Sequence, residues 1–169
     1  MPSPFSSETR RAFRTPAYIV CAVAIVVTVV EYIVTILPLT PRAQLWRFGS
    51  EGMLANVSAV PILMLMLALI IALSLADARA IRVVRAAAAV ACAFLGLVAI
   101  AFLMDIMKVK ANVSADASYN FMFASLVALF KILLQSLAAG AIALAARNAL
   151  ADLGTGIATS ATGRTAIAA

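Results

Sequence analysis

Four long blocks of apolar residues, separated by short polar segments, constrain this chain more than any other feature. The blocks cover residues 17–39, 54–76, 83–104 and 121–146. Each is long enough to cross the hydrocarbon core of a bilayer, which takes about 20 helical residues. Because lipid offers the backbone no hydrogen-bond partner, each block must be a helix. The sequence therefore predicts an all-α fold, a transmembrane four-helix bundle whose neighbouring helices are antiparallel.

Composition and patterning support the membrane class. Apolar residues make up 65% of the 169 residues and charged residues 12%, whereas a soluble domain averages about half apolar and a quarter charged. No segment shows the alternation of an outer-membrane β-strand. The first block is long for a signal peptide, contains Glu31 and ends without a small-x-small cleavage site. We therefore expect an uncleaved first helix, with Thr15 and Pro16 at its start.

Three regions follow from this division. Residues 1–16 are predicted to be a cytoplasmic N-terminal segment, and residues 17–150 the transmembrane domain. Residues 151–169 consist mainly of Gly, Ser, Thr and Ala. Such a segment cannot bury enough apolar surface to order itself, so we expect a flexible cytoplasmic tail.

The basic residues predict the orientation, since cytoplasmic loops carry an excess of Lys and Arg. With both termini inside, eight of the thirteen basic residues lie on the cytoplasmic side: Arg10, Arg11, Arg14, Arg79, Arg82, Arg85, Arg147 and Arg164. Four lie on the opposite side: Arg42, Arg47, Lys108 and Lys110. Both termini are therefore predicted to be cytoplasmic. The Ala- and Arg-rich composition is typical of bacteria, which suggests the inner membrane.

Several chemistries have no support in the sequence. There is no histidine, the usual axial ligand of b-type haem and the commonest metal ligand. Cys21 and Cys92 lie inside predicted helices without CxxC spacing, so they are interpreted as small buried residues. No Gly-rich phosphate loop is present, and no basic patch is interleaved with aromatic residues. We expect no cofactor, no metal, no nucleic-acid partner and no enzymatic activity.

Two charges lie inside the apolar blocks, Glu31 in the first and Lys131 in the last. Each belongs to a stripe of small and polar residues spaced alternately three and four apart, as expected of a helix face in contact with another helix. In the first block the stripe comprises Ala17, Cys21, Ala24, Thr28, Glu31, Thr35 and Pro38. In the last block it comprises Ala124, Ala128, Lys131, Gln135 and Ala138.

Depth suggests that the two stripes meet. At about 1.5 Å per residue, Glu31 and Lys131 lie roughly 12 and 15 Å below the outer surface, and Thr28 comes level with Gln135. We predict that the first and last helices are neighbours joined by a Glu31–Lys131 ion pair. Two alternatives stay open: a Glu31 that exchanges protons or cations, and a Lys131 that snorkels or pairs with a partner protein.

The two middle helices carry structural signals. Pro61 is expected to kink the second helix, with Ser58 available to bond the freed backbone. The third helix has Ala88, Cys92 and Gly96 at a spacing of four, a pattern that allows close helix packing.

Three function classes fit these features. The first is a non-catalytic accessory or assembly subunit of a larger membrane complex, whose partners are the lipid bilayer and other membrane subunits or itself. The alternative is a small oligomeric transporter or channel subunit that uses Glu31. The third, a membrane-embedded enzyme or sensor, has only Asp77 and Asp105 as candidate reactive groups. The first class is preferred because an ion pair would neutralise Glu31.

Overall fold

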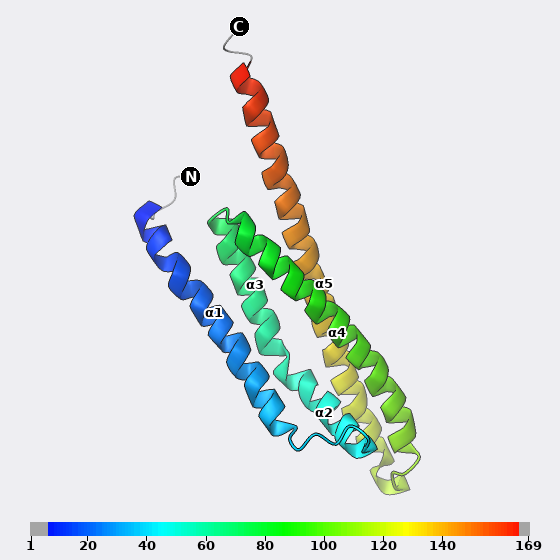
Figure 1. Cartoon of the computed structure of the whole chain (residues 1–169). Coiled ribbons are helices and arrows are strands. Elements are labelled where there is room, and N and C mark those ends of the chain that lie inside the picture. Colours follow the sequence, from blue (N-terminus) through cyan, green and yellow to red (C-terminus); the bar gives the residue numbers. More distant parts are fainter. Residues whose placement is uncertain (1–6, 166–169) are drawn as a thin grey trace.

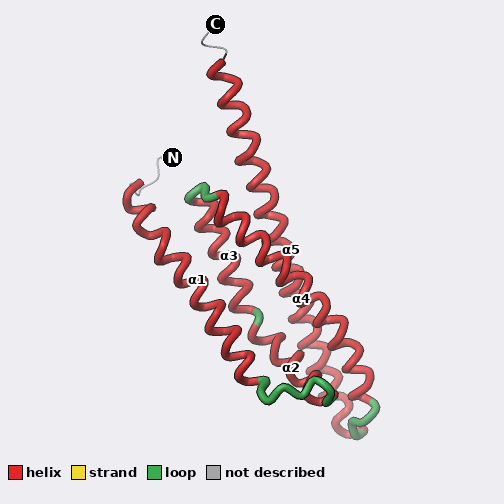
Figure 2. Tube along the Cα trace, in the orientation of Figure 1, coloured by secondary structure: helices red, strands yellow, loops and turns green. Residues whose placement is uncertain are grey.

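The computed structural model describes the backbone of residues 7–165, and within them the side chains of residues 12–114 and 116–153. These residues form five helices and no strand (Figures 1 and 2). The helices are α1 (Ser7–Thr35), α2 (Gln44–Val57), α3 (Ala59–Ser74), α4 (Ala78–Lys110) and α5 (Ala115–Thr165). The all-helical prediction is thus confirmed for the described residues.

The helices form four segments that are long and apolar enough to cross a membrane, which indicates a multi-pass membrane protein. These segments are Ala12–Thr35, Gln44–Ser74, Ala78–Lys110 and Asp116–Leu153. They match the four predicted apolar blocks in number and order. Their bounds differ: the first two segments end two to four residues before the predicted ends, and elsewhere charged residues that flank the blocks continue the helices.

The first helix differs most at its start. It begins at Ser7, so Thr15 and Pro16 lie inside it and not at its N-terminus. It ends at Thr35, four residues before the predicted end. The reason is Pro38, which disfavours the helical conformation of the residue before it and cannot donate a backbone hydrogen bond.

The second segment begins ten residues before the predicted start and is interrupted at Ser58, which separates α2 from α3 (Figure 2). The predicted kink at Pro61 therefore takes the form of a break three residues earlier. Pro61 has no N–H to donate to the Val57 carbonyl, and this weakens the ladder at that turn. The Ser58 hydroxyl lies 2.6 Å from the Leu54 carbonyl, to which it donates.

Helices α4 and α5 form a long hairpin, joined by residues 111–114 and packed along most of α4 (Figure 1). Buried residues recur every seven positions on both helices, the spacing of knobs-into-holes packing. On α4 these are Ile81, Ala88, Leu95, Phe102 and Val109, and on α5 they are Ser125, Ile132, Ala139 and Ala146. This hairpin contains most of the core of the bundle.

The central segment α2–α3 lies between α1 on one side and the α4–α5 hairpin on the other (Figure 1). Among the described side chains of α1, only Cys21 is buried. The helix is held at its C-terminal end by the Trp46 indole, which donates to the Ile36 carbonyl over 2.8 Å. The Tyr32 hydroxyl donates to the Ser50 carbonyl over 3.1 Å.

The last helix continues into the predicted tail. It remains helical to Thr165, and its final turns extend past the ends of the other helices (Figure 1). Residues 1–6 of the predicted N-terminal segment and residues 166–169 of the predicted tail lie outside the described residues.

Candidate functional site

The packed face of α1 follows the predicted stripe only as far as Thr28. It then continues at Tyr32, so that Glu31 and Thr35 are exposed. A straight helix has 3.6 residues per turn, and a stripe with a repeat of 3.5 rotates by about 20° per heptad. The prediction that Glu31 faces the bundle interior is therefore wrong. Among the described residues, the Glu31 carboxylate has no hydrogen-bond or ion-pair partner.

The predicted neighbours α1 and α5 do not meet. In the described chain, no α-carbon of α1 lies within 8 Å of one in α5, because α2–α3 separates the two helices. Lys131 instead reaches the adjacent α2, where its Nζ donates to Asn56 Oδ1 over 2.9 Å. Both of these side chains are exposed. The predicted Glu31–Lys131 ion pair within one chain is thus replaced by a contact between an ammonium group and a neutral amide.

Gln135 also turns toward α2 and not toward Thr28. Its Nε2 donates to the Ala55 carbonyl over 3.0 Å, and its Oε1 lies 2.5 Å from Ser58 Oγ, whose one proton it shares with the Leu54 carbonyl. Thr28 donates to the Ala24 carbonyl of its own helix over 2.8 Å. Gln135 therefore bonds the backbone and side chain at the α2–α3 break, where the helix ladder is interrupted.

The three predicted packing residues of α4 lie along the hairpin contact. Ala88 is fully buried, and the Cys92 carbonyl accepts from Ser136 Oγ over 3.0 Å. A Cβ added to Gly140 would lie 3.3 Å from Cys92 Sγ, and one added to Gly96 would lie 3.8 Å from Ser136 Oγ. The small residues of α4 thus face Ser136 and Gly140 of α5. Sequence reasoning missed this counterpart, although its spacing of four is the same signal.

A second contact that the sequence did not reveal is an ion pair between α2 and α4. It lies at the end of the bundle where the last turn of α4 carries Lys108 and Lys110. The Arg47 guanidinium donates to Asp105 through two bonds, Nε to Oδ2 over 3.0 Å and Nη2 to Oδ1 over 3.1 Å. The Asp105 side chain is only 6% exposed. Both residues lie outside the predicted apolar blocks, yet Asp105 continues the buried face of α4 between Phe102 and Ile106. That periodicity is the signal that could have located it.

Two unpartnered polar atoms lie on α2 on either side of Arg47. Glu51 Oε2 and Gln44 Nε2 are buried without a hydrogen-bond partner among the described residues. Glu51 is one helical turn from Arg47, whose guanidinium is already engaged by Asp105. Around Arg47 there are therefore two carboxyl groups, those of Asp105 and Glu51, for one guanidinium.

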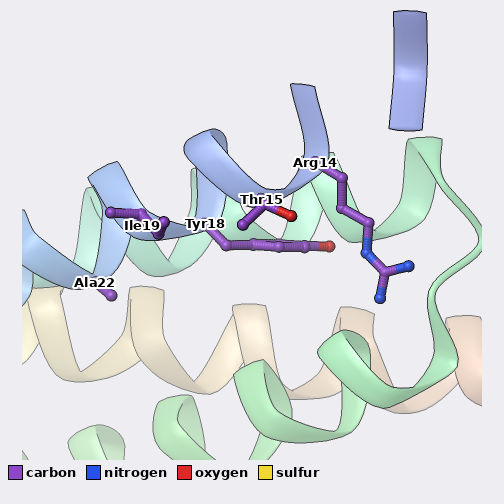
Figure 3. A pocket seen from close by; sticks show the side chains of 5 residues that line it. All are labelled: Arg14, Thr15, Tyr18, Ile19 and Ala22. Carbon is purple, nitrogen blue, oxygen red and sulfur yellow. The ribbon is translucent and has the colours of Figure 1, made fainter. Parts of the chain in front are cut away.

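The opposite end carries a more exposed ion pair between α1 and the start of α4. Arg14 Nη2 lies 2.5 Å from Asp77 Oδ2, and Asp77 also caps α4 by accepting from the backbone N–H groups of Arg79 and Ala80. Beside it, an open hollow of about 780 Å³ is lined by Arg14, Thr15, Tyr18, Ile19 and Ala22 of α1. Figure 3 shows Arg14 and Tyr18 extending from α1 toward the neighbouring helices. The Tyr18 hydroxyl is buried without a partner among the described residues.

A smaller cavity lies beside the α2–α3 break. It has a volume of about 180 Å³ and is bordered by α1, α2, α3 and α4. Its lining includes Thr28, Val29, Ser58, Pro61, Ala91 and Phe94. It separates α1 from α4 on one side of the central helix.

Comparisons with protein-family models, with curated proteins and with solved structures find no match. Within the described residues, no group of three or more His, Cys, Asp or Glu side chains is arranged to hold a metal ion. The functional argument therefore rests on the polar groups at membrane depth. Three of them, Lys131, Gln135 and Ser58, contact other helices, and Glu31 does not.

Proposed function

We propose that this protein is a non-catalytic accessory or assembly subunit of a larger membrane complex, in the bacterial inner membrane with both termini in the cytoplasm. The observation that supports this proposal is the state of the two intramembrane charges. Glu31 has no side-chain partner and Lys131 has only a neutral amide among the described residues. Charges at membrane depth are costly unless paired, so both groups favour association with another protein.

The surface of α1 supports the same proposal. Around Glu31 the helix exposes large apolar side chains, including Val27, Val30 and Val34. In lipid, such a surface has no hydrophobic drive to associate, and a polar group supplies the specificity of contact. An exposed carboxylate among valines is therefore a recognition group for a neighbouring transmembrane helix.

The orientation rests on the basic residues. The start of α1 and the last turns of α5 lie at the same end of the bundle (Figure 1). That end also carries the Arg14–Asp77 pair and, in the first turns of α4, Arg79 and Arg82. Basic residues at this end are what a cytoplasmic surface requires. The opposite end has Lys108 and Lys110 in the last turn of α4.

The test of the subunit role is purification of the tagged chain from native membranes in a mild detergent, followed by mass analysis. We expect a second, larger membrane protein to accompany the chain in a fixed ratio. A matched preparation in dodecyl sulfate should release that protein. Recovery of the chain alone, as a monomer or only with copies of itself, would contradict the accessory role.

The second candidate function is a small oligomeric transporter or channel subunit that uses Glu31. The same unpartnered carboxylate favours it, because a group that exchanges protons or cations must be reachable from a pathway. The protein reconstituted in liposomes should then carry a substrate-dependent proton flux. Glu31→Gln should abolish that flux and Thr35→Val, at the next exposed polar position of α1, should not.

A further inference from the structure

Glu31 and Lys131 are opposite charges on the outer surface of one bundle. Both side chains are exposed, and Asn56, the only partner found for Lys131 among the described residues, is exposed as well. Within the part of the chain whose side chains are described, neither charge forms an ion pair. Their positions on the surface decide what could pair with them.

Helix geometry places Glu31 on the side of α1 that faces away from α4. Val29 lines the cavity together with Ala91 and Phe94 of α4. Relative to the contact residue Thr28, Val29 is turned by about 100° and Glu31 by about 60° in the opposite direction, at 3.6 residues per turn. The cavity therefore lies on one flank of α1 and Glu31 on the other.

The surface that carries the two charges also includes one side of the central helix α3. Around α3, helices α4 and α5 are neighbours and the cavity lies between α4 and α1, so the open sector is the one between α5 and α1. A strip of exposed side chains with steps of four and three residues occupies that sector. We define the α1–α5 face as Glu31, this strip and Lys131, the strip being Asn56, Val60, Leu63, Leu67 and Ile70.

The two charges lie at similar depths in this face. Thr28 lines the cavity with Leu54 and Ser58, so it is level with that part of α2. Glu31 is then about one helical turn, roughly 5 Å, from the level of Asn56, where the Lys131 amine lies. The reach of the Glu and Lys side chains covers that difference.

We propose that the α1–α5 face is the interface of a two-fold symmetric homodimer, in which Glu31 of each copy pairs with Lys131 of the partner subunit. This inference rests on the proposed role in membrane assembly and names the first partner, a second copy of the chain. Rotation by 180° about an axis along the membrane normal leaves every residue at its own depth in the bilayer. With the axis passing beside Leu63, the rotation places α1 of one copy opposite α5 of the other. Both ion pairs then form at once.

Charge complementarity selects this occupant. One surface carries both signs, flanking an apolar strip, so it is complementary to itself under that rotation. A lipid tail offers neither charge, and headgroups lie at the membrane surface. The apolar side chains Val60, Leu63 and Leu67 would meet their own copies near the axis.

The experiment measures disulfide crosslinking between copies in lipid nanodiscs or mild detergent and combines it with charge-reversal substitutions. In a Cys21→Ala/Cys92→Ala background, Leu63→Cys should form a disulfide between copies under mild oxidation. The control is Leu97→Cys, 67% exposed on α4 outside the face, and it should not crosslink. Glu31→Lys alone or Lys131→Glu alone places like charges together, and each should lower crosslinking roughly tenfold or more.

Mixing provides the decisive outcome. Dimers formed between the Glu31→Lys chain and the Lys131→Glu chain contain both opposite-charge pairs again, so coexpression should restore crosslinking. The double variant carrying both substitutions should restore it too, which excludes misfolding as the cause of the loss. Unchanged crosslinking in the single variants, no rescue on mixing, or equal crosslinking at Leu97 would overturn the dimer.

The outcome separates this inference from the proposed function. If Leu63→Cys, oxidised in native membranes, crosslinks only to a different membrane protein, the homodimer is overturned and the accessory role stands. If the dimer forms and no larger protein accompanies it from native membranes, the dimer stands and the accessory role falls.

Discussion

The α4–α5 hairpin and helix α1 pack against their neighbours in different ways, although both carry small residues at helical spacing. In the hairpin, small residues occur on both helices, with Cys92 and Gly96 facing Ser136 and Gly140. On α1 the stripe packs against α3, and among the described side chains of α1 only Cys21 is buried. Small residues on both helices of the hairpin let the two backbones approach closely.

Polar contacts show the same contrast. The hairpin holds α2 through a two-bond ion pair whose acid is buried, Arg47–Asp105. Helix α1 is held by a half-exposed arginine, Arg14, at one end and by hydrogen bonds from Tyr32 and Trp46 at the other. The hairpin is therefore the stable unit, and α1 is the element that is free to use its outer face for association.

The largest expected effect is in the hairpin contact. Gly140→Leu should destabilise the protein by about 3 kcal/mol, because overpacking a close contact forces the helices apart. The added Cβ alone would already lie 3.3 Å from Cys92 Sγ. Reversible unfolding in mixed micelles, followed by circular dichroism, measures the change.

The matched control is Gly49→Leu, at a glycine of α2 with open space around it. It should leave the free energy of unfolding nearly unchanged. Equal losses at Gly140 and Gly49 would show that the hairpin contact is not closer than the rest of the surface.

An intermediate effect is expected at the buried ion pair. Asp105→Leu should cost about 2 kcal/mol, because it leaves the Arg47 charge without its carboxylate, and fully buried pairs lose roughly 3–5 kcal/mol. Arg47 is 38% exposed, so water offsets part of the loss. The double variant Arg47→Leu/Asp105→Leu should recover most of the stability, and the same unfolding assay compares the two. A double variant that is no more stable than the single one would argue against the pair.

The sequence predicted the helices well because membrane length and apolar content are local properties. The spacing of Ala88, Cys92 and Gly96 is likewise a property of one helix, and it led us to expect a packing role for them. Which helices are neighbours in the bundle is not a local property of the sequence. Depth and charge made Glu31 and Lys131 plausible partners, but they carry no information on the order of helices around α3.

The polar contacts at the ends of the bundle were missed for a related reason. Arg47 and Glu51 interrupt the apolar run, so the second helix was predicted to start at residue 54. The helix starts ten residues earlier because Asp105 neutralises Arg47 from a different helix. A charged residue beside an apolar block is interpreted as part of a loop unless a partner for it is known. The partner of Arg47 is 58 positions away in the sequence.

The smallest expected effect is at the ion pair that holds α1. The Arg14 side chain is 51% exposed, and an ion pair open to solvent contributes about 0.5 kcal/mol and is screened by salt. Arg14→Gln should therefore lower the free energy of unfolding by about that amount in low salt and by less in 0.5 M salt, with the salt concentration varied in the unfolding assay.

Asp77 separates the ion pair from the helix cap. Asp77→Asn keeps a side chain that can accept from Arg79 and Ala80, so it should match Arg14→Gln. Asp77→Ala also removes the cap and should cost about 1 kcal/mol more. If Arg14→Gln instead cost as much as Gly140→Leu, α1 would be as firmly held as the hairpin. Its exposed face would then be no freer than the rest of the bundle to exchange lipid for a second chain.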